Sequence, residues 1–198
     1  MIKKLIKKGI TASKNSIQRE TSFEYREQFW SFVGAFFGIG LLAFFQSYLL
    51  PQSENVLLIA SFGASSVLLY GAIQSPFSQP RNLIFGHLIS AIMGVTVYKV
   101  LPDIIWLTAP LSVALAIVFM QITKTIHPPG GATALIAVIG TEKIKALGYM
   151  YVISPVLIGS IVLFMVALIF NNMASHRKYP TDRRFMNVIR RLFLKKKI

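Results

Sequence analysis

The run FWSFVGAFFGIGLLAFFQSYLL at residues 29–50 decides the class of fold. Its 22 residues include no Asp, Glu, Lys or Arg. An α-helix rises about 1.5 Å per residue, so roughly 20 apolar residues are needed to cross the hydrocarbon core of a bilayer. This run is therefore predicted to be a mature transmembrane helix rather than a cleaved signal segment, because no small-residue cleavage site follows closely.

Three more runs without a charged residue are apolar enough for the same prediction, although the first of them is short and ends at Lys99. They cover residues 83–98, 104–122 and 148–170. Hydrophobic residues make up 54% of the chain and charges gather near its ends, which is not how a soluble domain of this size is built. The predicted fold is all-α: a polytopic transmembrane helical bundle with four full spans.

Two doubtful apolar segments lie between these spans. Residues 56–73 are long enough to cross but carry small polar side chains at their centre, and residues 132–140 number only nine. The two segments resemble each other, since GASSVL at 63–68 matches GATALI at 131–136 at an offset of 68 residues. We predict two short or re-entrant half-helices arranged as an internal repeat, with halves at about residues 29–101 and 104–171.

The charges predict the orientation in the membrane. Residues 1–28 hold seven Lys or Arg against three acids, and residues 172–198 hold nine against one. Lys- and Arg-rich flanks stay on the cytoplasmic side, so both ends are predicted to be cytoplasmic, in a bacterial inner (plasma) membrane. The number of crossings is then even. Either both short segments enter and return, which gives four spans, or both cross, which gives six spans and an inverted repeat.

The basic tails at 1–28 and 172–198 flank a transmembrane domain at 29–171 and interleave cationic with apolar residues. This pattern is typical of interfacial helices on anionic lipid, and docking of an acidic partner is the alternative. A nucleic-acid-binding surface is not predicted, because the cations flank apolar runs instead of lying on a folded polar surface. Because the bundle is thin, a homo-oligomer is a plausible assembly.

The run HPPGG at residues 127–131 predicts a binding site. Two prolines bar a continuous helix and two glycines permit close approach. A non-helical stretch at membrane depth persists only where it is buried in protein or lines a watery cavity. The helix that starts near Gly131 is expected to point free N–H groups and the Thr133 hydroxyl at whatever precedes it. Such a helix start favours negative charge, so we predict a site for a small inorganic anion.

The predicted substrate-binding residues share donor groups or positive charge, and they come from both halves of the repeat. They are Gly131, Ala132, Thr133, Ser65, Ser66, His127, Arg81 and Lys124. Two alternatives stay open: the small residues pack helices closely, and the hydroxyl groups satisfy freed backbone carbonyls. For His87, inside a span, we favour a neutral histidine bonded to a neighbouring helix over a functional one.

Enzyme chemistry is not predicted. The chain has no cysteine, and Glu54, Asp103 and Glu142 all fall in loops between the apolar runs. No nucleophile, base and acid therefore come together, and no ligand set for a metal is complete within the spans. We expect no catalytic residues, no metal and no cofactor.

The run IHPPGGATAL at 126–135 resembles the signature of the HPP family of integral membrane proteins. Further runs are similar to the family's pattern in the same order: SFGASS at 61–66, SP at 75–76, QPRN at 79–82, GH at 86–87, NN at 171–172 and RKYP at 177–180. The resemblance covers roughly residues 30–180. It implies a small four-span bundle and a transport role, which in plant plastid and cyanobacterial members concerns nitrite.

We therefore predict a membrane transporter or channel for a small monovalent anion, with nitrite as the substrate. The main alternative is a membrane-embedded scaffold or regulatory subunit that recruits an acidic partner through its basic tails. A membrane enzyme that uses His127 is a third and weaker interpretation.

Overall fold

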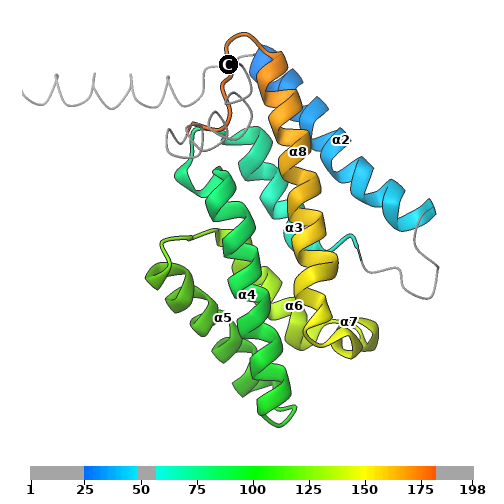
Figure 1. The fold of residues 1–198 in the computed structure, drawn as a ribbon, viewed down its shortest axis with the longest axis vertical. Coiled ribbons are helices and arrows are strands. Elements are labelled where there is room, and N and C mark those ends of the chain that lie inside the picture. The colour runs from blue at the N-terminus through cyan, green and yellow to red at the C-terminus, as the bar shows by residue number, and fades with distance from the viewer. Residues whose placement is uncertain (1–24, 49–56, 182–198) are drawn as a thin grey trace, which may run out of the picture.

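The computed structural model describes residues 25–48 and 57–181, and these residues form helices and connecting turns without a strand. Four helices have the length and apolar character needed to cross a membrane. They are α2 (Tyr25–Tyr48), α4 (Pro80–Val100), α5 (Ile105–Ile122) and the segment Val152–Met173, which combines the π-helical η4 (Val152–Leu157) with α8 (Ile158–Met173) (Figure 1). The predicted all-α bundle with four long apolar helices is confirmed. Residues 1–24 and 182–198, which make up most of the basic tails, lie outside the described residues.

The shorter helices lie between these four. The first is α3 (Ala60–Ser66), which continues as the π-helical η2 (Val67–Gly71), and a 3-10 turn η3 (Pro76–Ser78) precedes α4. The second is α6 (Pro128–Ile139), followed by the small helix α7 (Glu142–Leu147). The prediction of two short helices is thus confirmed. Helix α6 begins at its first proline, because a proline at the first helical position loses no hydrogen bond.

The first short segment runs the full way back along α2. The Leu58 N–H donates to the Gln46 side-chain oxygen near the end of α2, at 2.6 Å. Ser31, near the start of α2, donates to the Tyr70 carbonyl at 2.7 Å. Segment 58–70 is therefore antiparallel to α2 and ends at the opposite end of the bundle from where it began.

The second short helix also continues in one direction. A Cβ atom at Gly86 would lie 2.5 Å from His127, and one at Gly94 would lie 2.9 Å from the Ala134 Cα. Helix α6 therefore runs parallel to α4 and close against it. Helix α5 is antiparallel to α4, since Arg81 at the start of α4 donates to the Thr123 carbonyl at 2.9 Å.

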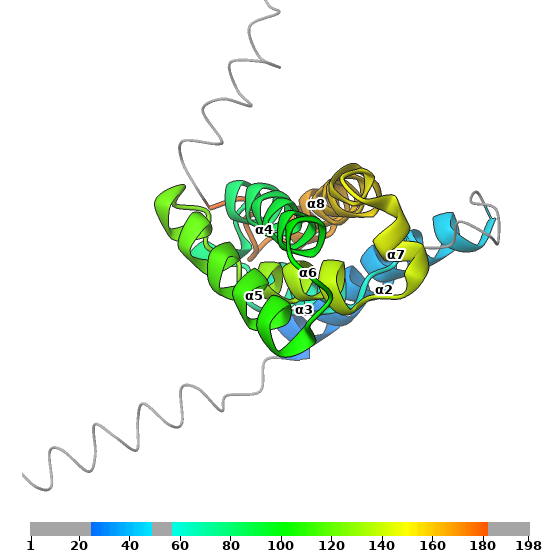
Figure 2. The ribbon, with the colours of Figure 1, turned by 90° about the horizontal axis from the view of Figure 1, so that it is seen from below.

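The six segments alternate in direction along the chain, as the six-crossing alternative requires, although only four of them are long. They also interlock. Helix α4 of the first half packs against α5 and α6 of the second half, and α8 of the second half packs against α2 and η2 of the first. Figure 2, seen from below, shows α5, α6 and α3 beside one another on one side of α4. These are the directions expected of two inverted halves.

A buried ionic contact fastens the end of the bundle at which α2 begins and α8 ends. The Arg177 guanidinium, only 5% exposed, donates from Nε to the Glu27 carboxylate at 2.9 Å and from Nη1 to the Tyr70 carbonyl at 3.2 Å. Asn171 donates to the neighbouring Leu69 carbonyl at 2.9 Å. These side chains satisfy carbonyls that the end of η2 leaves without a helical partner, and so they fix the short segment.

Candidate functional site

Five buried polar side chains from α3, α4 and the start of α6 meet inside the bundle, and none is more than 1% exposed. We call them the polar cluster: Ser61, Ser65, His87, His127 and Thr133. The two imidazole rings have their centroids 4.7 Å apart, and the Phe62 ring lies edge-on to His87 at 5.4 Å. Buried polar groups are costly unless they are paired, and the five side chains pair with one another and with nearby carbonyls.

His87 is held on both sides of its ring. Its Nε2 lies 2.7 Å from the Ser65 hydroxyl, and its Nδ1 lies 2.7 Å from the Thr133 hydroxyl. Ser65 and Thr133 are the residues that the 68-residue offset places at equivalent positions of the two repeats. The two short helices therefore supply matching hydroxyl groups to one imidazole on a long helix.

His127 is positioned by the prolines and glycines around it. It precedes Pro128 and is extended, with φ −139° and ψ 103°, as the residue before a proline usually is. Gly86 has no side chain to keep His127 away from α4. The ring then reaches the Phe77 carbonyl with Nδ1 at 2.8 Å and the Ser65 hydroxyl with Nε2 at 3.0 Å. Because a carbonyl only accepts, Nδ1 of His127 carries hydrogen.

The cluster ends at Thr133 and Ser61. The Thr133 hydroxyl donates to the Ser61 hydroxyl at 2.9 Å. The Tyr151 hydroxyl, from the residue directly before η4, donates to the Thr133 backbone carbonyl at 3.1 Å. The cluster is thus one connected row of groups from Phe77 through both histidines to Ser61, and the Ser65 hydroxyl also lies within donating distance of the Ser61 backbone carbonyl, at 3.1 Å.

Three of the eight predicted site residues meet in the polar cluster, namely Ser65, His127 and Thr133. Arg81 and Lys124 are exposed at the end of the bundle, and Lys124 has a left-handed backbone with φ 56°. Gly131 and Ala132 are half-buried on α6 but contribute no side-chain donor. Ser66 is buried, and its hydroxyl is the only buried side-chain polar atom without a hydrogen-bond partner in the described part of the chain.

The expected free amides at the start of α6 are not found. Pro128 and Pro129 carry no N–H, and the Gly130 N–H donates to the His127 carbonyl at 2.8 Å. The prolines occupy the positions at which a helix normally leaves donors free. The donors that face the interior are therefore side-chain hydroxyl and imidazole groups, and the argument from bare amides is wrong for this helix.

The predicted site left out His87 and Ser61. A lone histidine within a span is more often a neutral ring bonded to a neighbouring helix than a functional group, so His87 was not placed in the site. The internal repeat could have pointed to His87. Ser65 and Thr133 are equivalent, so a residue contacting both short helices lies where the two halves meet, and His87 is the imidazole on the helix between them.

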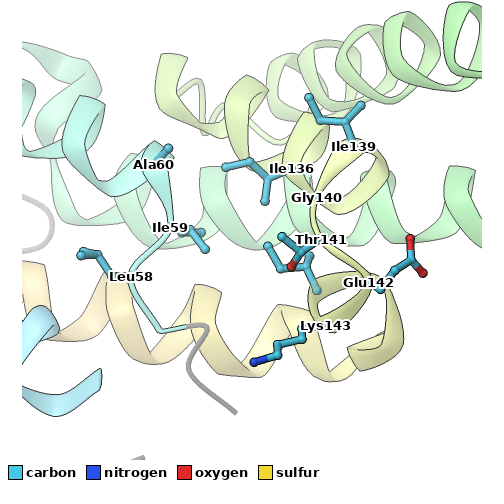
Figure 3. Close-up of a pocket in the computed structure, with 10 residues that line it drawn as sticks. Leu58, Ile59, Ala60, Ile136, Ile139, Gly140, Thr141, Glu142 and Lys143 are labelled. Atoms are coloured by element: carbon cyan, nitrogen blue, oxygen red, sulfur yellow. The ribbon is translucent and has the colours of Figure 1, made fainter. Parts of the chain in front are cut away.

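An apolar pocket of about 780 Å³ opens at the end of the bundle opposite Arg177. In Figure 3, Ile59 and Ala60 from the start of α3 face Ile136 and Thr141 across it. Ala60 directly precedes Ser61 in the cluster, and Ile136 lies one turn after Thr133. The pocket therefore lies near the Ser61 end of the polar cluster.

The histidines meet hydroxyl groups and not carboxylates. Within residues 25–48 and 57–181 no group of three His, Cys, Asp or Glu side chains is arranged to hold a metal ion. The described acids lie at the ends of the bundle: Glu27 contacts Arg177, while Asp103 and Glu142 contact Lys145 at 3.6 and 3.4 Å. The site therefore offers hydrogen-bond donors and two protonatable rings without a nearby negative charge.

Long apolar helices that alternate in direction around a buried polar row define a polytopic α-helical integral membrane protein. The family model for the transmembrane region of the HPP family matches residues 20–180, so the chain belongs to that family.

Two curated relatives are named as transmembrane proteins. One transmembrane protein of Dictyostelium discoideum is 44% identical over 157 residues, which are 76% of this chain and 49% of the relative. A second from the same organism is 39% identical over 154 residues, which are 76% of this chain and 54% of that relative. The chain spans about half the length of the curated relatives it matches. No solved structure matches the chain.

Proposed function

We propose that the protein is a membrane transporter or channel for a small monovalent anion, with nitrite as the first candidate. The observation that carries the proposal is the polar cluster itself. Polar and ionisable groups inside a membrane bundle are costly, and they mark the paths of solutes and ions. A row of hydroxyl and imidazole groups without a neighbouring carboxylate suits a negatively charged solute.

The proposed negative charge of the substrate follows from the groups in and around the cluster. Hydroxyl and imidazole N–H groups donate to anion oxygens, and a protonated imidazole adds positive charge. A carboxylate beside these rings would compete with the anion, but Glu27, Asp103 and Glu142 are engaged elsewhere. The groups of the cluster bond to one another at 2.7–3.0 Å, so a bound anion has to replace some of these contacts.

The proposed path links the two ends of the bundle. At one end lies the apolar pocket beside Ser61. At the other, the Phe77 carbonyl contacts His127, and the exposed Arg81 and Lys124 provide positive potential that attracts anions. With both tails in the cytoplasm, as the positive charges favour, the pocket opens on the opposite side. A bacterial plasma membrane stays a prediction, since the relatives above come from a eukaryote.

The test is anion flux in proteoliposomes. Uptake of nitrite, nitrate, formate and chloride is measured for the wild type, for Thr133→Val and for Thr108→Val. Thr108 is also a buried threonine, but its hydroxyl donates only to its own helix, at the Ile104 carbonyl. We expect nitrite flux for wild type and Thr108→Val, and a loss of tenfold or more for Thr133→Val. Equal flux in both variants contradicts the site.

The alternative is a membrane scaffold or regulatory subunit without enzymatic activity. Its support is the charge of the tails, with nine Lys or Arg against one acid in residues 172–198. On this alternative the tails bind anionic lipid or an acidic partner, and the bundle serves as an anchor. Correctly folded wild-type protein that moves none of the four anions supports the scaffold and rejects transport.

A further inference from the structure

The segment after α8 folds back over the end of the bundle at which Arg177 lies. We call residues 174–181 the strap, and they form the orange loop beyond α8 in Figure 1. Arg177 ties the strap to Glu27 of α2. The Asn172 side chain, near the end of α8, donates to the Tyr179 carbonyl at 2.6 Å and accepts from the Tyr179 N–H at 3.1 Å. The strap is therefore fastened at two points along its length.

The strap lies on the turn that leads into α4. The Tyr179 hydroxyl donates to the Ser78 carbonyl at 2.8 Å, and Tyr179 is only 2% exposed. Two residues later the Thr181 N–H donates to the Gln79 side-chain oxygen at 2.8 Å. Ser78 and Gln79 are themselves buried. The strap thus covers η3 and the residue after it, and it separates this turn from the solvent.

The same turn carries the carbonyl that holds His127. Phe77 lies in the middle of η3, and its carbonyl accepts from His127 Nδ1 at 2.8 Å. The turn is also bonded within itself, because Ser78 Oγ and Gln79 Nε2 both donate to the Ile73 carbonyl, at 3.0 and 3.1 Å. It is therefore a compact unit that lies between the strap on its outer side and the polar cluster on its inner side.

The two ends of the polar cluster differ in access. A pocket of about 780 Å³ lies near the Ser61 end, whereas η3 and the strap lie over the His127 end, and His127 is fully buried. A transporter that opens its site to one side at a time needs a closure on each side. Such closures are surface segments that open locally while the rest of the protein stays folded. The strap is a segment of this kind, since it is non-helical and is held by side-chain hydrogen bonds.

We infer that the strap is a gate, which closes the path to the polar cluster at the Arg177 end of the bundle. Its release lets η3 move away from His127, so that an anion reaches the cluster from that side. Tyr179 is the positioning residue, because its hydroxyl bonds to the residue directly after Phe77. Moving η3 breaks the contact between Phe77 and His127, which couples the gate to the site. The inference rests on the proposed anion transport and adds its regulation.

Opening of the strap is measured by thiol labelling of the full chain in lipid nanodiscs. The chain has no cysteine, so Ser78→Cys places a single thiol beneath the strap, where a water-soluble maleimide reacts only after opening. Adding Tyr179→Phe removes one hydrogen bond from the closed form. The labelling rate follows the population of the open form, so we expect it to rise about two- to tenfold.

The matched control for labelling is Tyr149→Phe. It also removes one hydroxyl hydrogen bond, which joins Tyr149 to Thr96 at 3.0 Å near the opposite end of the bundle. We expect Tyr149→Phe to leave the labelling rate of Ser78→Cys unchanged. Equal labelling rates with and without Tyr179→Phe overturn the gate, because the strap then does not hold the turn closed. A rise of the same size in Tyr149→Phe overturns it too, since the opening is then global unfolding.

Flux shows whether the strap controls transport, and this test does not need the cysteine variant. Nitrite uptake into proteoliposomes is compared for wild type, Tyr179→Phe and Tyr149→Phe. Nitrous acid crosses lipid unaided, so protein-free vesicles are subtracted and nitrate is tested in parallel. We expect uptake at least twofold faster for Tyr179→Phe and unchanged for Tyr149→Phe. A purely structural role for Tyr179 predicts equal or slower uptake.

The outcomes separate the gate from the proposed function. Wild-type flux with equal or slower uptake by folded Tyr179→Phe overturns the gate and leaves the proposed transport standing. No flux of either anion in any of the three proteins rejects both. Flux that rises in Tyr179→Phe together with faster labelling beneath the strap supports both.

Discussion

Ser65 and Thr133 lie at equivalent positions of two inverted helices and bond to opposite nitrogens of one imidazole, each at 2.7 Å. The site is therefore built from residues of both halves of the chain. Neither half contains it alone, because His87 and Ser65 come from the first half and Thr133 and His127 from the second. The predictions below examine this site and the packing that supports it.

Replacing Thr133 separates the role of its hydroxyl from that of its shape. Thr133→Val keeps the volume but leaves the buried His87 Nδ1 without a partner, which costs about 1–3 kcal/mol of folding free energy. Thr133→Ser keeps the hydroxyl and should retain most of the stability and of the anion flux. Thermal unfolding in detergent and the flux assay measure the two effects. A Thr133→Val protein as stable as Thr133→Ser would show that this hydrogen bond is dispensable.

Two glycines of α2 form a matched pair for packing. A Cβ atom at Gly38 would overlap the buried Tyr70 hydroxyl, whereas one at Gly40 would meet nothing within 4 Å. In lipid such small residues let helices approach closely. Gly38→Ala should destabilise the protein by about 1–3 kcal/mol, and Gly40→Ala should be neutral or stabilise it by up to about 1 kcal/mol.

A double variant identifies the cause of the Gly38 effect. Tyr70→Phe removes the atom closest to the new methyl group, so adding it to Gly38→Ala should recover part of the lost stability. Chemical unfolding of the four proteins gives the coupling free energy. If the effects of Gly38→Ala and Tyr70→Phe on stability are purely additive, the Tyr70 hydroxyl is not the source of the strain.

Replacing Arg177 should destabilise the fold, even when the new residue is lysine. Its guanidinium donates to Glu27, Tyr70 and Asn171 at once, and a lysine ammonium cannot reach several partners in this planar geometry. Because Glu27 is 40% exposed, we expect Arg177→Lys and Arg177→Ala to cost about 2–3 kcal/mol, below the range for a fully buried pair. Lys178→Ala, at the exposed next position, is the control and should unfold at the wild-type temperature.

The ion pairs of Lys145 with Asp103 and Glu142 predict that the stability of the protein depends on pH in the alkaline range. Removal from water lowers the pKa of Lys145, but the Asp103 and Glu142 carboxylates outweigh this and raise it above its ordinary value of 10.5. A raised pKa in the folded state stabilises the protein below the unfolded pKa, and this contribution is lost as the pH rises through the folded pKa. The difference in unfolding temperature between wild type and Lys145→Gln should therefore be constant near neutrality and shrink above about pH 10. A constant difference at all pH values contradicts the coupling.

The long helices were predictable because length and the absence of charge decide them. Residues 29–50 and 104–122 needed no knowledge of tertiary contacts. The directions of the short segments were not predictable in this way. They depend on where Leu58 and Tyr70 meet α2, and such contacts leave no periodic trace in the sequence.

The candidate site was predicted in part. His127, Ser65 and Thr133 stood out through the HPPGG run and the repeat. Arg81 and Lys124 carry the right charge, but burying a full charge without a partner is unfavourable, and both side chains stay exposed. His87 lies 40 residues before His127 in the chain, and only the close contact at Gly86 brings the two rings together.

The last helix of each half, α4 or α8, packs against the other half, and this affects how the protein assembles during synthesis. Helix α4 finds its main partners in α5 and α6, which the ribosome synthesises later, and α8 completes a group begun by α2. We therefore expect the side of α4 that carries Gly86 and Gly94 to stay without its α6 partner until translation has passed residue 139. Assembly of the bundle is a late event, and a chain cut between α4 and α5 regains its shape only when both fragments are present together.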